Sequence, residues 1–404
     1  MFKTIDEALD WIMAQRNENS TFEHFKQIME SIGNPQNDFY TIHVAGTNGK
    51  GSTVSYLRDL LISQGFKVGT LQSPHYISHL DRIRVNGINI PAETFLRIIN
   101  NRLKFFKDNY LSMFEMDYII MYDFFKEENI DVAVVEVGLG GRLDSTNVID
   151  NTKLSIITTI GYDHMDRLGN TLELICKEKC GIIKDNSKVL IGDLPKQCRD
   201  IVIEEANKHN SEFFDTPIYD DLGDRRFKYN NEEYELESYA TYQLHNASLA
   251  LKAFEIVSKD YSFEMDLDKA KKALSKTIWE NRFQIVKDNP RVILDGGHNV
   301  PGIEALVKSF DQFSGSKCII FSALKRKEYK KMLDILIDHT DKLVITAFNN
   351  HEEILDLNEF ENTKFELNPD YIEAIDKAIS EYDNILICGS LYFLSDVVLN
   401  YNFK

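Results

Sequence analysis

The sequence contains little cysteine and no long apolar run, and each absence excludes a class of protein. Five cysteines occur in 404 residues, at spacings that match neither a zinc site nor a disulfide framework. We therefore expect reduced thiols in a cytoplasmic protein. No apolar run is long enough to span a membrane, and the N-terminal residues lack the apolar core of a signal peptide.

Positive charge is also scarce, because 46 Lys and Arg residues stand against 64 Asp and Glu residues and the net charge is −18. This balance argues against nucleic acids and anionic membranes as partners. A small anionic substrate stays compatible with it, since one cleft can be locally basic. The hydrophobic content of 43% is that of a globular protein, and the length predicts two or more domains.

The stretch from His43 to Thr53, H-V-A-G-T-N-G-K-G-S-T, carries the strongest functional signal. An apolar run over 39–45 predicts a buried strand, and the spacing over 54–61 predicts a helix beyond the glycine-rich turn. In this setting backbone N–H groups and a lysine bind phosphate. We predict a nucleotide site formed by Gly46, Thr47, Asn48, Gly49, Lys50, Gly51, Ser52 and Thr53.

The match to the standard phosphate loop is imperfect. Val44 stands where the first glycine is expected, and Gly51 stands where Ser or Thr usually follows the lysine. The alternative is a glycine-rich connection in some other α/β protein. Three glycines, a lysine and two hydroxyls between a strand and a helix favour the nucleotide site.

Strands and helices alternate along the chain, which predicts an α/β fold with two doubly wound domains. We expect a phosphate-loop, ATP-binding domain with a mostly parallel sheet over 1–285, and a smaller Rossmann-like domain over 286–404. Two short helices are expected within 4–32, around a polar segment at 15–20. The acidic, Tyr-rich stretch 213–240 predicts a small antiparallel excursion.

Three candidate ligand residues, Ser73, Glu136 and His164, each follow an apolar run. The carboxyl ends of parallel strands are where such sheets bind ligands, so we expect these residues beside the phosphate loop. Oxygens of Ser and Glu suit Mg²⁺, whereas His is a less usual ligand for it. Taken singly, Glu136 is better explained by a buried hydrogen bond and His164 by a helix cap, but taken together with the phosphate loop these residues favour the metal site.

Four more residues have both a structural and a functional explanation. Lys179 is placed near a helix end, where the helix dipole favours a cation. Arg282, near the domain boundary, suits either an interdomain salt bridge or ATP phosphates. Asp295 and His298 flank two glycines that permit close approach to a ligand, although such turns are common without one.

Taken together, the motifs resemble folylpolyglutamate synthase, which in many bacteria also acts as dihydrofolate synthase, within the Mur ligase superfamily. They occur in the expected order between about residues 40 and 300. The motifs are H-V-A-G-T-N-G-K-G-S-T, Ser73-Pro74-His75, E-V-G-L-G-G-R-L-D from Glu136, Asp163-His164, E-K-C-G-I-I-K from Glu178, His245-Asn246-Ala247 and D-G-G-H-N from Asp295.

The resemblance implies Mg²⁺ ions, two of them, held in part by Ser73, Glu136 and His164. It also implies that Asn246, Arg282 and Asp295 contact ATP, that CO₂ carbamylates Lys179, and that the C-terminal domain is the glutamate-ligase domain. A buried neutral amine can take up CO₂ and become an anion, so the lysine chemistry is reasonable. Together with Lys50 and His298, Lys179 forms the expected catalytic set.

The implied activity is an ATP-dependent ligase that joins L-glutamate to a folate, or to dihydropteroate, through an acyl phosphate. We expect a monomer. One alternative is another Mur-type ligase, although cell-wall members carry a further domain ahead of the phosphate loop and only a short helical segment precedes Gly46 here. The other is an ATP-binding regulator without catalysis on the same scaffold.

Overall fold

The computed structural model describes residues 1–15, 21–349, 353–360 and 364–403, so most of the polar segment predicted at 15–20 lies outside the described residues. Contacts divide the chain into two compact units, which are described separately. The first unit comprises 1–219 and 246–275, and the second comprises 220–245 and 276–404. The sequence-based boundary at 285 falls inside a strand of the second unit, since Arg282–Asp288 pairs with Arg291–Asp295.

The first unit contains an eight-stranded sheet in the order β4-β3-β2-β5-β1-β6-β7-β8. Strands β2, β5, β1, β6, β7 and β8 pair in parallel, whereas β3 and β4 form an antiparallel hairpin across Asn86 and Gly87. The strands are β1 Tyr40–Ala45, β2 Val68–Leu71, β3 Ile83–Val85, β4 Ile88–Asn89, β5 Val132–Glu136, β6 Thr152–Ile157, β7 Lys188–Ile191 and β8 Glu212–Phe214. The predicted mostly parallel sheet is confirmed.

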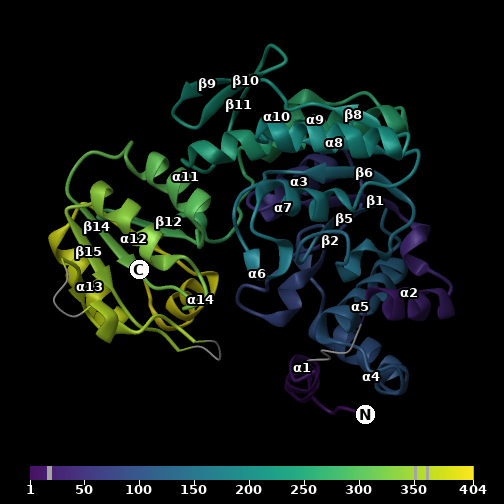
Figure 1. Cartoon of the computed structure of the whole chain (residues 1–404), viewed down its shortest axis with the longest axis horizontal. Helices are drawn as coiled ribbons and strands as arrows, with labels where there is room; N and C mark the ends of the chain where they lie inside the picture. The colour runs from purple at the N-terminus through teal and green to yellow at the C-terminus, as the bar shows by residue number, and fades with distance from the viewer. Residues whose placement is uncertain (16–20, 350–352, 361–363, 404) are drawn as a thin grey trace. The chain divides into compact units, whose positions relative to one another are not determined.

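Helices cover both faces of this sheet, with α3 on one face and α5 and α2 on the other (Figure 1). Helix α5 is buried along most of its length, and Tyr118, Tyr122 and Phe125 lie in one core with Val135 of β5. The helices are α1 Ile5–Met13, α2 Phe22–Ser31, α3 Lys50–Ser63, α4 Ala92–Asp108, α5 Met113–Glu128, α6 Met165–Leu168, α7 Leu172–Cys180, α8 Lys196–Lys208 and α10 Leu267–Leu274; α9, Thr241–Tyr261, begins in the second unit and continues in the first. Short 3₁₀ turns occur at Pro35–Asp38, His79–Arg82 and Ser145–Val148.

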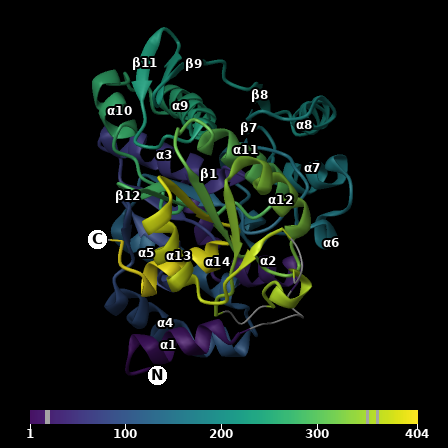
Figure 2. The same ribbon diagram turned by 90° about the vertical axis from the view of Figure 1, so that its left-hand side faces the viewer.

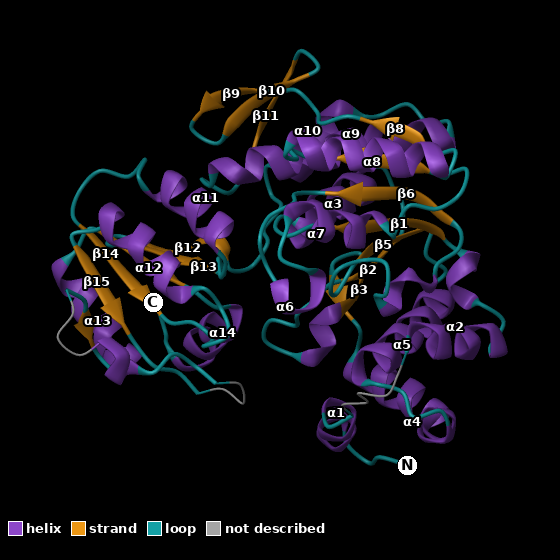
Figure 3. Ribbon diagram, in the orientation of Figure 1, coloured by secondary structure: helices purple, strands orange, loops and turns teal. Residues whose placement is uncertain are grey.

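The second unit contains a six-stranded sheet in the order β12-β13-β17-β14-β15-β16, parallel except for the edge strand β12 (Figure 3). A separate antiparallel sheet, β11-β10-β9, matches the excursion predicted over 213–240, apart from β8 in the larger sheet. The strands are β9 Asp220–Gly223, β10 Arg226–Tyr229, β11 Glu232–Glu235, β12 Arg282–Asp288, β13 Arg291–Asp295, β14 Lys317–Phe321, β15 Lys342–Ile345, β16 Glu366–Leu367 and β17 Asn384–Cys388.

Successive side chains of the central strands point to opposite faces of the sheet, so the second unit has two cores, one on each face. On β14, Ile319 and Phe321 pack with α11 and α12, whereas Cys318 and Ile320 pack with α13 and α14. Figure 2 shows these two helix pairs, green and yellow, on opposite sides of the strands. Burial on both faces explains why these strands are continuous apolar runs. The helices are α11 Val300–Phe310, α12 Tyr329–Leu336, α13 Tyr371–Glu381 and α14 Leu391–Asn400, with 3₁₀ turns at Ile337–His339 and Leu357–Phe360.

No helix within the described residues combines the length and apolar character that crossing a membrane requires.

Candidate nucleotide and ligase site

The predicted phosphate loop is a tight turn between β1 and α3, and the helix begins at Lys50, earlier than the sequence pattern indicated. Gly49 has φ +84°, a left-handed conformation that favours glycine. A Cβ on Gly46 would lie 1.8 Å from Thr158 Oγ1, so only glycine fits there. Similarly, Asn246 Oδ1 lies 2.4 Å from where a Gly49 Cβ would be, which places this predicted ATP contact against the turn.

The turn is held by the segment that follows β6, which the sequence patterns did not single out. The backbone N–H of Thr47 donates to Thr159 O at 2.8 Å, and that of Asn48 donates to Thr159 Oγ1 at 3.0 Å. Thr158 Oγ1 donates to Asn48 O at 2.6 Å. These hydrogen bonds fix the backbone of the turn. The first N–H groups of an α-helix have no acceptor within the helix, so the N-terminus of α3 suits an anion.

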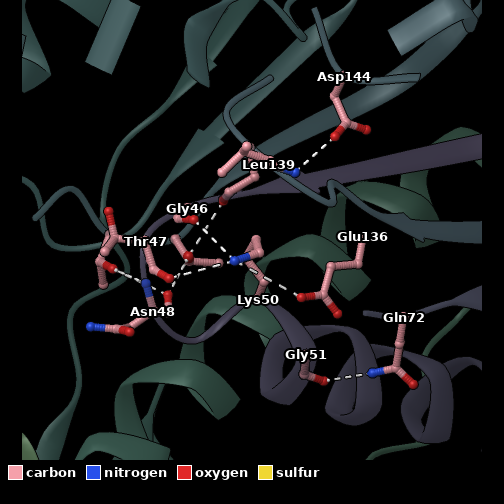
Figure 4. Close-up of polar contacts among 12 residues, drawn as sticks. Gly46, Thr47, Asn48, Lys50, Gly51, Gln72, Glu136, Leu139 and Asp144 are labelled. Carbon is pink, nitrogen blue, oxygen red and sulfur yellow. Dashed lines mark hydrogen bonds and ion pairs between the residues drawn. The ribbon is translucent and has the colours of Figure 1, made fainter. Parts of the chain in front are cut away.

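Lys50 extends back over the turn and faces Glu136 at the carboxyl end of β5 (Figure 4). Its Nζ donates to Gly46 O at 3.2 Å and lies 3.9 Å from Glu136 Oε1. The Glu136 side chain is only 4% exposed, so its carboxylate interacts with the ammonium in a poorly solvated setting. An ammonium and a carboxylate therefore meet at the phosphate loop.

Lys179 reaches the same turn from α7. Its Nζ donates to Gly46 O at 2.9 Å, and the residue is buried. Burial, and secondarily the charge of Lys50, lowers the pKa of Lys179 to about 7, while Asp163 and Asp144 oppose the shift. A substantial share of this amine is therefore neutral and nucleophilic at neutral pH.

The loop after β5 is stabilised by a buried chain of polar groups. Asp144 accepts hydrogen bonds from the Leu139 N–H at 2.7 Å and from Thr146 Oγ1 at 2.5 Å. Thr146 Oγ1 in turn lies 2.8 Å from His43 Nε2. Burial lowers the pKa of His43 to about 3, so the imidazole is neutral and donates through Nε2. The sequence included His43 and Asp144 as motif residues but gave no sign of this connection.

The predicted magnesium ligands lie at or just beyond the carboxyl ends of β2, β5 and β6; β5 and β6 flank β1, and β2 is the next strand beyond β5. Ser73 comes just after β2, where Gln72 Nε2 donates to Gly51 O at 3.0 Å and ties this segment to α3 (Figure 4). His164 has φ +49° and directly precedes α6. Among the described residues, no three His, Cys, Asp or Glu side chains cluster as metal ligands. The predicted set is of a different composition, because it combines one Glu and one His with the hydroxyl of Ser73. Its donor chemistry, a buried carboxylate beside a hydroxyl-bearing loop, fits Mg²⁺.

In the second unit, Asp295 at the end of β13 accepts several hydrogen bonds. Tyr242 Oη donates to its Oδ2 at 2.5 Å, the Phe283 N–H donates to Oδ2 at 2.8 Å, and the Gly297 N–H donates to Oδ1 at 2.7 Å. Burial raises the pKa of Asp295, and the charge of Arg282 partly offsets this. The sequence patterns gave no reason to select Tyr242.

His298 Nδ1 lies 2.9 Å from Gly296 O, so Nδ1 donates and the other ring nitrogen is left as the acceptor in the neutral imidazole. Gly296, two residues before it, is closely packed. A Cβ on Gly296 would lie 2.3 Å from Leu391 Cδ2 and 3.4 Å from Arg282 Nη1. Arg282, Asp295 and His298 thus surround one turn of the second unit.

The chain matches two family models, which together cover most of the residues described above. The Mur ligase middle domain matches residues 44–254, and the Mur ligase glutamate ligase domain matches residues 281–391. The dihydrofolate synthase/folylpolyglutamate synthase of Bacillus subtilis is 32% identical over 98% of this chain and 99% of its own. The chain belongs to this family of Mur ligases. The resemblance predicted from the motifs is thereby confirmed.

Solved structures of the family agree in fold. The apo form of L. casei FPGS is 26% identical, covers 98% of both chains and has a TM-score of 0.84. A structure described as an FPGS-AMPPCP-folate complex is 27% identical, covers 98% of both chains and has a TM-score of 0.82. The predicted two-domain α/β architecture of the family is confirmed.

Proposed function

We propose that this chain is a folylpolyglutamate synthase, an ATP-dependent acid–amino-acid ligase that adds L-glutamate to a folate. The observation that carries the proposal is the convergence of Lys50 and Lys179 on Gly46, with Glu136 beside Lys50. Family membership supports it, as does the relative whose complex is described as containing folate and AMPPCP, an ATP analogue.

In this proposal the γ-phosphate passes to a carboxylate of the folate, and the amine of glutamate then displaces phosphate to form the amide. The turn over 46–49 and the N-terminus of α3 bind the phosphates, and Lys50 neutralises charge that develops on the transferred group. Gly51, Ser52 and Thr53 are in the first turn of α3. Asn246, Arg282 and Asp295 are the further proposed ATP contacts, and His298 the proposed contact to phosphate or glutamate.

Mg²⁺, held by Ser73, Glu136 and His164, would supply charge neutralisation of the phosphates. We further propose that the neutral amine of Lys179 adds to CO₂. The nitrogen–carbon bond forms as one C=O π bond of CO₂ breaks and its electron pair moves to oxygen, and the nitrogen releases a proton to solvent. The side chain thereby changes from a potential cation to an anion able to face a second Mg²⁺. The lowered pKa of Lys179 supports this, because only a neutral amine adds to CO₂.

Residues 1–285 are the proposed ATP-binding domain and 286–404 the proposed glutamate-ligase domain. Closure of the second over the first would exclude water, which would otherwise hydrolyse the acyl phosphate. We also propose a cytoplasmic monomer that binds neither nucleic acid nor membranes. The five cysteines are free and buried, as suits a reducing compartment.

One experiment separates the candidate activities. The protein is incubated with ATP, Mg²⁺ and L-glutamate, tetrahydrofolate and dihydropteroate are offered separately, and products are identified by mass with ADP release in parallel. A glutamylated tetrahydrofolate supports the proposal, and a product from dihydropteroate adds the second activity printed in the name of the Bacillus subtilis relative. ATP binding without ADP release would instead indicate a regulator, and turnover with a different acceptor another Mur-type ligase.

A further inference from the structure

A buried carboxylate on α5, that of Asp117, contacts the loop that carries Ser73. This loop, residues 72–82, follows β2 and is called the Ser73 loop below. Asp117 is 0% exposed, and its neighbours Met116 and Tyr118 belong to the apolar core. Burying a charged carboxylate lowers the stability of the fold unless other groups pair with it. The groups that pair with Asp117 are therefore informative.

Within the described part of the chain, the two side chains that pair with the Asp117 carboxylate, His79 and Arg82, both lie on the Ser73 loop. His79 Nε2 donates to Asp117 Oδ1 at 2.7 Å, and both side chains are essentially buried. On the other side, Arg82 Nε lies 3.7 Å from Asp117 Oδ2. In a setting that excludes most water, these two contacts tie the loop to the interior of the first unit more strongly than surface ion pairs would.

The contact continues from Arg82 to His75, two residues beyond Ser73. Arg82 Nη2 lies 3.2 Å from His75 Nδ1, and the rings of His75 and His79 are 5.6 Å apart. A guanidinium only donates, so His75 Nδ1 accepts and the ring proton resides on Nε2. Arg82, which lies beside Asp117, therefore sets the tautomer of His75.

The rest of the loop is held from within. The Asp81 carboxylate accepts hydrogen bonds from the backbone N–H groups of Tyr76, Ile77 and Ser78, at 2.9–3.1 Å. These bonds shape the turn but do not attach it to another element. Polar contacts attach the loop through Gln72 to α3 and through Asp117 to α5, and the His79 ring also packs edge-on against Phe95 of α4.

We propose that Asp117 is a positioning residue that acts through His79 and Arg82 to hold the Ser73 loop, and with it Ser73 and His75, at the carboxyl edge of the sheet. This positioning role depends on the proposed function in one respect only: that function names Mg²⁺ of the nucleotide complex as the ion that Ser73 binds. Asp117 itself touches no substrate and is not a catalytic residue.

The first test measures amide hydrogen exchange in the full-length protein without ligands. Asp117→Asn keeps an acceptor for His79 and removes the negative charge that faces Arg82, so exchange of peptides within 73–82 should rise about tenfold, with α3 unchanged. Asp123→Asn is the matched control, because Asp123 lies on the same helix and pairs with Arg102 near the surface. Equal exchange in the Asp117→Asn and wild-type loops, or faster exchange throughout the first unit, would overturn the proposal.

A second variant keeps the proposal testable if Asp117→Asn does not fold. Arg82→Lys preserves the charge but lacks the second nitrogen that reaches His75, so exchange near 75–78 should rise while α5 stays protected. The kinetic readout is the Mg²⁺ concentration that gives half-maximal ADP release. It should rise about tenfold in both variants, as for other residues that support a metal ligand, with the Kd for ATP measured without metal unchanged. An unchanged Mg²⁺ requirement contradicts the positioning role.

The two proposals fail in different ways. If the wild-type protein releases no ADP with any folate and glutamate, the proposed function fails, but the exchange experiment still decides the role of Asp117. If ADP is released normally and the Asp117→Asn loop exchanges as in the wild type, only the positioning proposal fails.

Discussion

The amines of Lys50 and Lys179 donate to the same oxygen atom, the backbone carbonyl of Gly46, at 3.2 and 2.9 Å. They reach it from different helices, α3 and α7. Two ammonium groups this close disfavour each other, and the one that is more buried gives up its proton more easily. Lys179 is the buried partner, and its pKa is lowered to about 7.

Lys179→Met should stabilise the protein at pH 6 and have little effect near pH 10. Below pH 7 the native state must hold a buried ammonium, at a cost on the order of 5 kcal/mol. Between pH 7 and about 10.5 the unfolded chain binds the proton that the native amine has lost, so wild-type stability from this group rises with pH. Urea unfolding at pH 6, 8 and 9.5 in CO₂-free buffer measures the difference. Lys153→Met, at an exposed position, is the control, and parallel pH curves for wild type and Lys179→Met would contradict the prediction.

Removal of CO₂ should lower the rate of ADP release, and added bicarbonate should restore it. The reason is the proposed carbamate on Lys179, whose formation depends on dissolved CO₂ and on the neutral amine. Lys179→Ala should have a low rate that bicarbonate does not change, while short carboxylic acids that replace the lost anion should raise it. Rates in degassed buffer that match those in bicarbonate would show that the amine acts without CO₂.

Lys50→Ala should lower folate- and glutamate-dependent ADP release by at least about 100-fold, because a charge held at the transferred phosphate is removed. The fold should persist, since Lys50 is at the first position of α3 and its side chain is partly exposed. Lys67→Ala removes an ammonium paired with Glu128 near the surface and should leave the rate unchanged. Near-normal turnover of Lys50→Ala would refute the assigned role.

The phosphate loop was predictable because its signal is local. Glycines, a lysine and two hydroxyls lie within eight residues, and the structure places the turn and helix where those residues indicate. The start of α5 is also locally encoded, because Ser112 and Glu115 form a capping box there.

The partners of the site residues were not predictable, since they meet across long stretches of chain. Thr158 and Thr159 become part of the phosphate loop only because β6 is the neighbour of β1. In the sequence Asp117 is one of several charged residues of α5, and nothing distinguishes it until His79 and Arg82 are placed beside it. The strand β12 was missed for another reason, because an edge strand with several polar residues lacks the continuous apolar run of a central strand.

Chelation of divalent metal should abolish ADP release, and Mg²⁺ should restore it. Glu136→Gln keeps the shape of the side chain but removes the charge that lies 3.9 Å from Lys50 Nζ, so the Mg²⁺ concentration for half-maximal rate should rise at least about tenfold. A titration of rate against free Mg²⁺ at saturating ATP measures this. Identical titration curves for Glu136→Gln and wild type would remove Glu136 from the metal site.

Two buried threonines on the first unit provide a matched stability test of the polar chain behind the site. Thr146 Oγ1 joins His43 to Asp144, so Thr146→Val leaves two buried groups without that partner and should cost about 2–3 kcal/mol. Thr152 Oγ1 is buried and makes no hydrogen bond within the described residues. Replacing it with the isosteric valine removes an unsatisfied group, so Thr152→Val should change stability by less than about 0.5 kcal/mol or increase it.

Urea unfolding of both variants measures these free energies. Thr146→Val should also raise the KM for ATP, because Asp144 then no longer holds the loop that follows Glu136 as firmly. Thr152→Val should have wild-type kinetics, since Thr152 lies at the opposite end of β6 from the segment that holds the phosphate loop. If both substitutions lowered the free energy of unfolding equally, the loss would come from removing a buried hydroxyl and not from breaking the connection between His43 and Asp144.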